Sequence, residues 1–199
     1  MKNETDIYQK IDDYILRLIR ESSPARTIWN VERIRQNKPA DWNYIDGCMI
    51  TALLAMSEIS GDPAYFDFAE RFISDFISED GAIRTYDPEK YNLDDINEGR
   101  VLFPLYERTG KEKYRKAADR LYAQLLKQPR TFEGSFWHKA IYPNQVWLDG
   151  LYMAEPFYMR YETLFHKMEK CQDVLKQFQN VEKNMRDPKT GLYYHGYDE

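Results

Sequence analysis

S-G-D-P-A-Y at residues 60–65 recurs as T-G-K-E-K-Y at residues 109–114, an interval of 49 positions. In both copies a glycine follows the end of one predicted helix, and a tyrosine opens the apolar face of the next helix. Ala69 and Ala118 keep the same interval. A repeat of roughly 50 residues predicts a chain built from similar helical hairpins.

A glycine marks the turn after each predicted hairpin: Gly81, Gly134 and Gly191. No segment shows sustained alternation of apolar and polar residues, so we expect no substantial sheet. The sequence therefore predicts an all-α chain, whose hairpins would stack as a superhelix or close into a ring with its loops at one end. The expected helical units are residues 7–20, 31–35, 45–77, 93–127 and 146–185.

The composition indicates one globular domain over residues 1–199, because 43% of the residues are apolar. The net charge is -5 and no stripe of lysine and arginine is present, which argues against a nucleic-acid partner. Residues 1–10 lack an apolar leader and no apolar run approaches ~18 residues, so we expect no membrane partner and a cytoplasmic location. Cys48 and Cys171 are expected to be reduced thiols.

Residues 131–157 combine aromatic side chains with isolated acids, amides and cations. Sugar-binding sites have this composition, because rings stack on the C–H faces of a sugar while a few polar groups bind its hydroxyls. His138 and Lys139 are candidates for such polar contacts, and Lys139 would suit an acidic sugar. An ordinary surface position is the plain alternative for a His-Lys pair.

Asp149 lies in the run W-L-D-G-L-Y-M, and Pro143 and Asn144 predict the start of its helix. The apolar neighbours Trp147 and Leu148 would disfavour the charged form of this carboxyl group and so favour an acid. A helix also stabilises an aspartate in its first turn without any catalytic role, so both interpretations remain open.

Asp94 and Asp95 stand at the start of another predicted helix, in the run Y-N-L-D-D-I-N-E-G-R. Two neighbouring carboxyl groups separate their pKa values by mutual repulsion, which suits a pair with different roles. Helix capping explains these residues equally well.

The run F-W-H-K-A-I-Y-P-N-Q-V-W-L-D-G-L-Y-M-A-E-P-F at residues 136–157 resembles the active-site region of the unsaturated rhamnogalacturonyl hydrolases, glycoside hydrolase family 105. The resemblance extends from about Trp42 to the end of the chain. It implies an (α/α)6 toroid of repeated helical hairpins, with only about the first half of the ring present, and hence a C-terminally incomplete catalytic domain. An open half-ring is expected to show little or no activity alone.

The resemblance also implies an activity without a cofactor. The substrate would be an unsaturated uronic-acid oligosaccharide left by a pectin (rhamnogalacturonan) lyase, from which a terminal 4,5-unsaturated galacturonyl residue is hydrolysed. Asp149 and Asp94 would be catalytic, with Asp95 as the alternative second carboxylate. The implied substrate-binding residues are Tyr44, His138, Lys139, Trp147 and His195.

Three further expectations remain. The histidines at positions 138, 166 and 195 lack zinc-type spacing, so we expect no metal site. A non-catalytic α-hairpin module that binds a glycan or a protein is the alternative function. The apolar faces at the open edge of a half-ring favour self-association.

Overall fold

The computed structural model of the protein describes residues 4–199, with side chains from Ile7 onward. Apart from two three-residue strands, this part of the chain is helix and loop, so the all-α prediction is confirmed. The elements are α1 (Glu4–Arg20), α2 (Val31–Gln36), α3 (Tyr44–Ser60), α4 (Pro63–Phe76), η1 (Pro88–Lys90), α5 (Leu93–Glu98), η2 (Gly99–Val101), α6 (Leu102–Thr109), α7 (Glu112–Lys127), β1 (Gln145–Trp147), α8 (Leu148–Phe165), α9 (Cys171–Met185) and β2 (Gly196–Asp198).

The sequence repeat corresponds to two equivalent helix–helix turns. Gly61 ends α3 and Gly110 ends α6, and both are left-handed, with φ of 73° and 66°. Glycine adopts this conformation without the strain that a side chain would add. Tyr65 and Tyr114 are both fully buried on the outgoing helices α4 and α7. The predicted hairpins are therefore confirmed.

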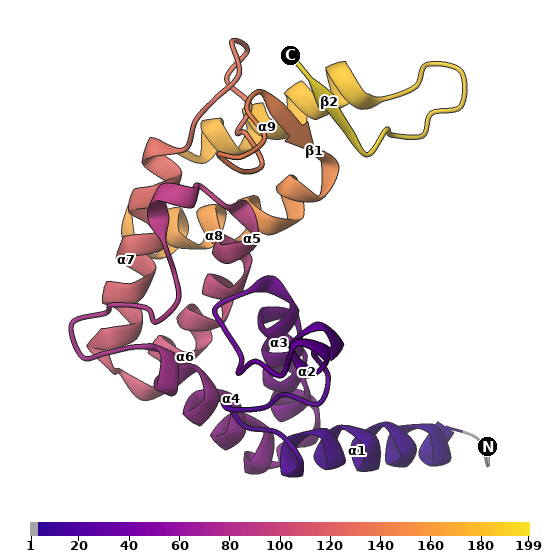
Figure 1. Ribbon diagram of the computed structural model, residues 1–199, viewed down its shortest axis with the longest axis vertical. Helices are drawn as coiled ribbons and strands as arrows, with labels where there is room; N and C mark the ends of the chain where they lie inside the picture. The colour runs from indigo at the N-terminus through magenta and orange to yellow at the C-terminus, as the bar shows by residue number, and fades with distance from the viewer. Residues whose placement is uncertain (1–3) are drawn as a thin grey trace.

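The helices form two layers along an open arc (Figure 1). The inner helices α3, α5 and α8 pack on one another, and each is followed by an outer helix, α4, α7 or α9. The arc runs from α1 at the N-terminal end to α9 and β2 at the C-terminal end (Figure 1). This arrangement is the partial ring of α-hairpins expected from the sequence.

The inner helix of the second hairpin is interrupted, which the sequence did not predict. A 3-10 turn at Gly99–Val101 separates α5 from α6. A Cβ atom at Gly99 would lie 2.3 Å from a methyl group of Leu121 and 3.0 Å from the ring of Phe157. The break therefore coincides with a close approach of α7 and α8, where only glycine fits.

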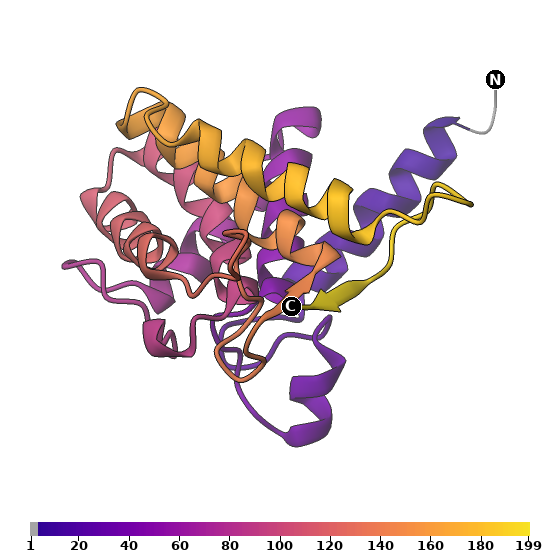
Figure 2. The same cartoon turned by 90° about the horizontal axis from the view of Figure 1, so that it is seen from above.

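The long connections that precede α3 and α8 both lie at the lower side of Figure 2, whereas the turn between α8 and α9 lies at the upper left. Gly81, Gly134 and Gly191 each have positive φ and lie inside connections that β-bridges close, so the expected glycine turns are confirmed. The strands β1 and β2 pair antiparallel, which fixes the C-terminal residues against the connection that precedes α8.

An apolar groove of about 510 Å³ lies along α8 and α9 at the C-terminal edge of the arc. Its lining includes Leu148, Leu151, Phe178 and Tyr193. The groove agrees with the expected open edge, and self-association through it stays a prediction.

Cys48 and Cys171 are free thiols, as expected. None of the helices in the described residues is both long and apolar enough to cross a membrane. The expectation that residues 1–10 hold no leader includes residues 1–3, which lie outside the described part. The cytoplasmic location and the lack of nucleic-acid and membrane partners stay predictions.

Candidate active site

Asp94 lies in the first turn of α5 and faces an imidazole and an ammonium group from another connection. The side chain of Asn92 caps this helix by accepting from the N–H of Asp94 at 3.2 Å. The carboxylate of Asp94 lies 3.1 Å from Nε2 of His138 and 2.6 Å from Nζ of Lys139. The side chain of His138 is fully buried and that of Asp94 is 14% exposed, so solvent screens this group only weakly.

Burial raises the pKa of Asp94, but its contacts with His138 and Lys139 outweigh burial and hold the pKa below its usual value. Asp94 is therefore a carboxylate at neutral pH. Such a group can stabilise a positive charge that develops on a bound molecule.

Asp149 lies in the first turn of α8, but the predicted start of that helix was wrong. The helix begins at Leu148, after β1, and Asn144 instead occupies a left-handed position in the preceding turn. Oδ1 of Asp149 is buried and makes no hydrogen bond within the described residues. Ligand atoms of Asp94, His138 and Asp149 all lie within 4.8 Å of one another.

Two carboxylates and an imidazole at this separation are a donor set that a divalent cation can accept. The histidine spacing along the sequence did not reveal this set, because two of its members are aspartates. Here the ammonium group of Lys139 lies against Asp94 and balances its charge. We assign no metal to the group, and the absence of a metal site stays a prediction.

Trp147 is the centre of an aromatic group beside these aspartates. Its ring stacks on His138 with centroids 4.3 Å apart and on Tyr142 at 5.3 Å. His195 lies 5.7 Å away in a tilted arrangement. Stacked rings of this kind offer a flat face to a sugar. Within residues 131–157, Phe136 and Phe157 instead belong to the hydrophobic core.

Backbone hydrogen bonds connect the segments that carry these side chains. The carbonyl of His138 accepts from Leu93 N at 3.1 Å, next to Asp94, and His138 N donates to Gln145 O at 2.8 Å. The carbonyl of His195 accepts from Leu148 N at 2.7 Å, next to Asp149. The start of α5 is therefore held against the connection that precedes α8, and the start of α8 is held against the connection that follows α9.

Tyr44 lies with Asp94 in a polar hollow of about 250 Å³ between the starts of α3 and α5. Lys90 and Asn92 also line it. Thus Tyr44 and the group around Trp147 approach Asp94 from different parts of the chain. The structure brings together all seven residues that the sequence singled out, while their individual roles stay predictions.

Asp95 points toward Asn92, whose Nδ2 donates to it at 3.0 Å. Burial and the charge of Asp94 raise the pKa of Asp95 to about 7, although Lys90 and Lys139 act against this rise. Asp94, in contrast, is the carboxylate that contacts His138. The geometry therefore favours Asp94 over Asp95 as the partner of Asp149.

Two buried acids near the site were missed in the sequence. Glu98 is fully buried and accepts a hydrogen bond from the N–H of Asn43, and burial raises its pKa well above the usual value. Asp46 accepts from Trp29 Nε1 at 2.6 Å and Asn43 Nδ2 at 2.9 Å. These bonds hold the start of α3, and hence Tyr44, against α5. In the sequence, Asp46 and Glu98 could have been recognised only as acidic residues next to apolar positions of a predicted helix.

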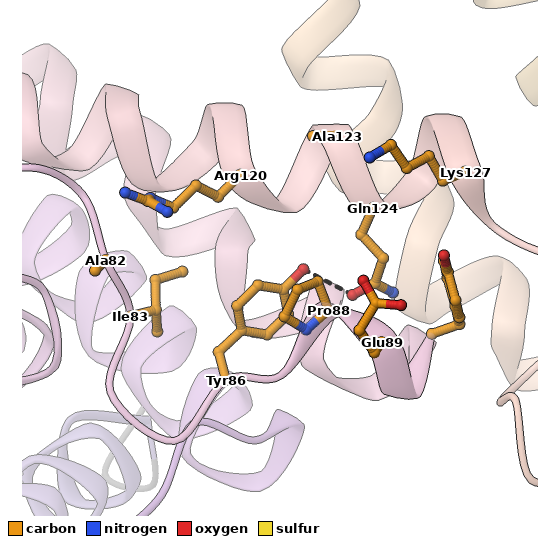
Figure 3. Close-up of a pocket in the computed structure, with 10 residues that line it drawn as sticks. Ala82, Ile83, Tyr86, Pro88, Glu89, Arg120, Ala123, Gln124 and Lys127 are labelled. Atoms are coloured by element: carbon orange, nitrogen blue, oxygen red, sulfur yellow. Dashed lines mark hydrogen bonds between the residues drawn. The ribbon is translucent and has the colours of Figure 1, made fainter.

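A second hollow, of about 320 Å³, lies between α7 and the segment at residues 82–91 (Figure 3). Its lining includes Glu89, Arg120 and Lys127, but neither Asp94 nor Asp149. It is therefore separate from the site described above.

The sequence profile of Glycosyl Hydrolase Family 88 matches residues 20–199. The chain belongs to this family. Among solved structures, a family 105 glycoside hydrolase from C. acetobutylicum ATCC 824 is 44% identical, with a TM-score of 0.78 over 84% of this chain and 47% of that one. The resemblance to family 105 is thereby confirmed.

Two other relatives extend this comparison. Unsaturated rhamnogalacturonyl hydrolase YesR of Bacillus subtilis (strain 168) is 26% identical over 163 residues, which are 79% of this chain and 45% of YesR. The α-1,6-mannanase GH76A of Salegentibacter sp. HEL1_6 is 18% identical with a TM-score of 0.65 over 81% of this chain and 47% of that one, a likeness of fold alone. The family 88 chain spans about half the length of the relatives it matches.

Proposed function

We propose that the chain carries the catalytic aspartates of a glycosidase that removes a terminal 4,5-unsaturated galacturonyl residue from the products of pectin and rhamnogalacturonan lyases. The observation that carries this proposal is the convergence of Asp94, His138 and Asp149 within 4.8 Å, beside the ring of Trp147. Membership of family 88 and the similarity to YesR, whose name includes this substrate class, support it.

In this mechanism Asp149 donates its proton to C4 of the enol ether, and the C4–C5 double bond becomes a single bond. The positive charge that forms is shared by C5 and the ring oxygen. Water adds to C5 and returns a proton to Asp149, which acts first as an acid and then as a base. The resulting hemiketal opens and releases the rest of the oligosaccharide. This reaction does not attack the anomeric carbon, and it needs no cofactor.

Asp94 stabilises the charge at C5, because its pKa lies below the usual value and it is ionised at neutral pH. Lys139 holds Asp94 and, with its side chain 23% exposed, can also contact the carboxylate of the uronic acid. Trp147 supplies the aromatic ring on which the unsaturated sugar stacks, with His138 stacked against that ring and His195 tilted beside it. Tyr44 binds at the hollow next to Asp94.

The alternative is a non-catalytic module that binds a glycan on the same aromatic face. This alternative is kept because the chain spans only about half the length of its relatives. Residues from the other half of a ring would be needed to complete a catalytic site. Both functions require the protein to bind the sugar, but only the enzyme would convert it to product.

Loss of the enol absorption band of an unsaturated galacturonyl disaccharide tests the proposal. The assay uses the chain alone and the chain joined to the half of the C. acetobutylicum relative that it does not cover. Asp94→Asn should abolish turnover by the completed ring, whereas the matched control Asp95→Asn should retain most of it. A larger loss from Asp95→Asn would assign the second carboxylate to Asp95. Binding without any turnover, even in the completed ring, would favour the alternative.

A further inference from the structure

Gln124 and Gln128 are two buried glutamines near the end of the outer helix α7, and the mechanism above uses neither. Their residues are 2% and 3% exposed, respectively. Gln128 is the C-cap residue directly after α7, at the point where the chain turns toward residues 131–147. A buried amide must find partners for both of its N–H groups, so the identity of those partners indicates what the side chain holds.

Both N–H groups of Gln128 bind carbonyls beside the candidate active site. Nε2 donates to Tyr91 O at 2.7 Å and to Trp137 O at 2.8 Å. Tyr91 stands three residues before Asp94, and Trp137 immediately precedes His138. One amide group therefore joins the segment that carries Asp94 to the segment that carries His138 and Lys139.

Gln124 and Tyr86 hold the amide of Gln128 in place. Nε2 of Gln124 donates to Oε1 of Gln128 at 3.1 Å and to Asn92 O at 3.3 Å. Oε1 of Gln124 accepts from the hydroxyl of Tyr86 at 2.7 Å, and both side chains are visible where they meet in the hollow of Figure 3. The chain of bonds fixes which end of the Gln128 amide faces the two carbonyls.

Among the described residues, two backbone hydrogen bonds also join these segments. Leu93 N donates to His138 O at 3.1 Å, and Ala140 N donates to Lys90 O at 3.0 Å. The distance between Asp94 and Lys139 depends on the register of these segments, because each residue lies within two positions of such a bond. Gln128 fixes that register from the outer layer of helices.

We propose that Gln128 is a positioning residue for the proposed reaction: its amide sets the register of Asp94 against His138 and Lys139. The catalytic consequence rests on the function proposed above, whereas the structural role does not. Replacement by Met removes both donors and keeps the length of the side chain. A small displacement of reacting groups can lower a rate by about 10²-fold.

Gln177 on α9 provides a matched control. It is 3% exposed, its Nε2 donates to Gly134 O at 3.0 Å, and its Oε1 accepts from Phe136 N at 2.9 Å. It thus holds a connection in the same way, at the turn at residues 131–136, and also donates to Asp173 Oδ1 on its own helix at 3.4 Å. Gln128→Met and Gln177→Met should therefore both lower stability, and only the first should loosen the segments around Asp94.

Amide hydrogen exchange of the full chain tests the proposal without requiring turnover. The experiment uses native conditions, in which amides exchange through local opening of the structure and not through global unfolding. Gln128→Met should accelerate exchange at the amides of Leu93 and Ala140. Gln177→Met should accelerate exchange at the amide of Phe136 and leave Leu93 and Ala140 unchanged. Equal acceleration at every amide in both variants would show a merely global loss of stability and would overturn the proposal, as would unchanged exchange at Leu93 in Gln128→Met.

Kinetics provide a second readout wherever the protein turns over the disaccharide. Gln128→Met should lower kcat by about 10²-fold and leave KM nearly unchanged, because the aromatic face that binds the sugar is kept. A change in KM alone would contradict a role in positioning Asp94. If wild type shows no turnover even in the completed ring, the proposed function fails, and the exchange experiment still decides the role of Gln128.

Discussion

Replacement of Lys139 by Met should make the protein less stable at neutral pH and should change how its stability depends on pH. Lys139 Nζ lies 2.6 Å from Asp94, and the two side chains are 23% and 14% exposed. A hydrogen bond to a charged group contributes about 1.5–3 kcal/mol, and partial exposure places this pair near the middle of that range. We therefore expect a loss of about 2 kcal/mol at neutral pH.

The sign of the pH effect follows from the lowered pKa of Asp94. A carboxyl group with a lowered pKa in the folded state stabilises the protein above its unfolded-state pKa, about 3.9, and this contribution is lost as pH falls through the folded-state value. In Lys139→Met, burial continues to raise the pKa of Asp94 while one opposing cation is gone. The stability difference between wild type and variant should therefore be full near neutral pH and shrink below about pH 4.

Urea unfolding followed by circular dichroism at several pH values measures this difference. Lys183→Met is the matched control, because Lys183 also pairs with a carboxylate, Glu133, but is 65% exposed. It should change stability much less, since solvent screens exposed pairs. Equal losses in the two variants, or a loss in Lys139→Met that stays constant down to acid pH, would refute the reasoning.

Three further predictions concern the core and the site. Trp147→Ala should weaken binding of the unsaturated disaccharide by up to about tenfold, the upper limit of a stacking contact, measured by calorimetry; unchanged affinity with a large loss of stability would make Trp147 a core residue. Phe68→Ala should lower the free energy of unfolding in urea by about 3–5 kcal/mol, because Phe68 is 2% exposed and packs on Trp29 and Phe72. A loss under about 1 kcal/mol would show that neighbouring side chains fill the cavity left by the ring. Glu98→Gln should change stability at neutral pH by less than about 0.5 kcal/mol, because burial raises the pKa of Glu98 and favours its neutral form, which glutamine resembles; a loss above about 2 kcal/mol would show a carboxylate there.

The hairpins could be predicted because their signals are local. Gly61 and Gly110 each end a helix in a conformation that glycine favours, and the buried tyrosines that follow them open apolar helical faces. Asp94 could be placed at a helix start for the same reason, since Asn92 is a typical capping residue.

Features that depend on distant contacts could not be predicted. The break at Gly99 coincides with a close approach of α7 and α8, and nothing within residues 93–109 reports that approach. β1 is only three residues long and pairs with a segment at the end of the chain, so its alternation is too short to recognise.

The convergence of Asp94 and Asp149 likewise required the packing of α5 on α8, although the resemblance to family 105 named both residues. Gln128 left one usable signal, because it continues the apolar face of Leu121 and Leu125 at helical spacing. A polar residue on such a face indicates a buried hydrogen bond.

Turnover and binding by Asp149→Asn test the central claim most directly, namely that Asp149 is the acid of a sugar site. In the chain completed with the second half of the C. acetobutylicum relative, wild type should remove the enol absorption of the unsaturated galacturonyl disaccharide. Asp149→Asn should bind the disaccharide with a similar Kd and lose turnover by at least about 10²-fold, the contribution of a positioned general acid. Near-native turnover by Asp149→Asn would contradict the account.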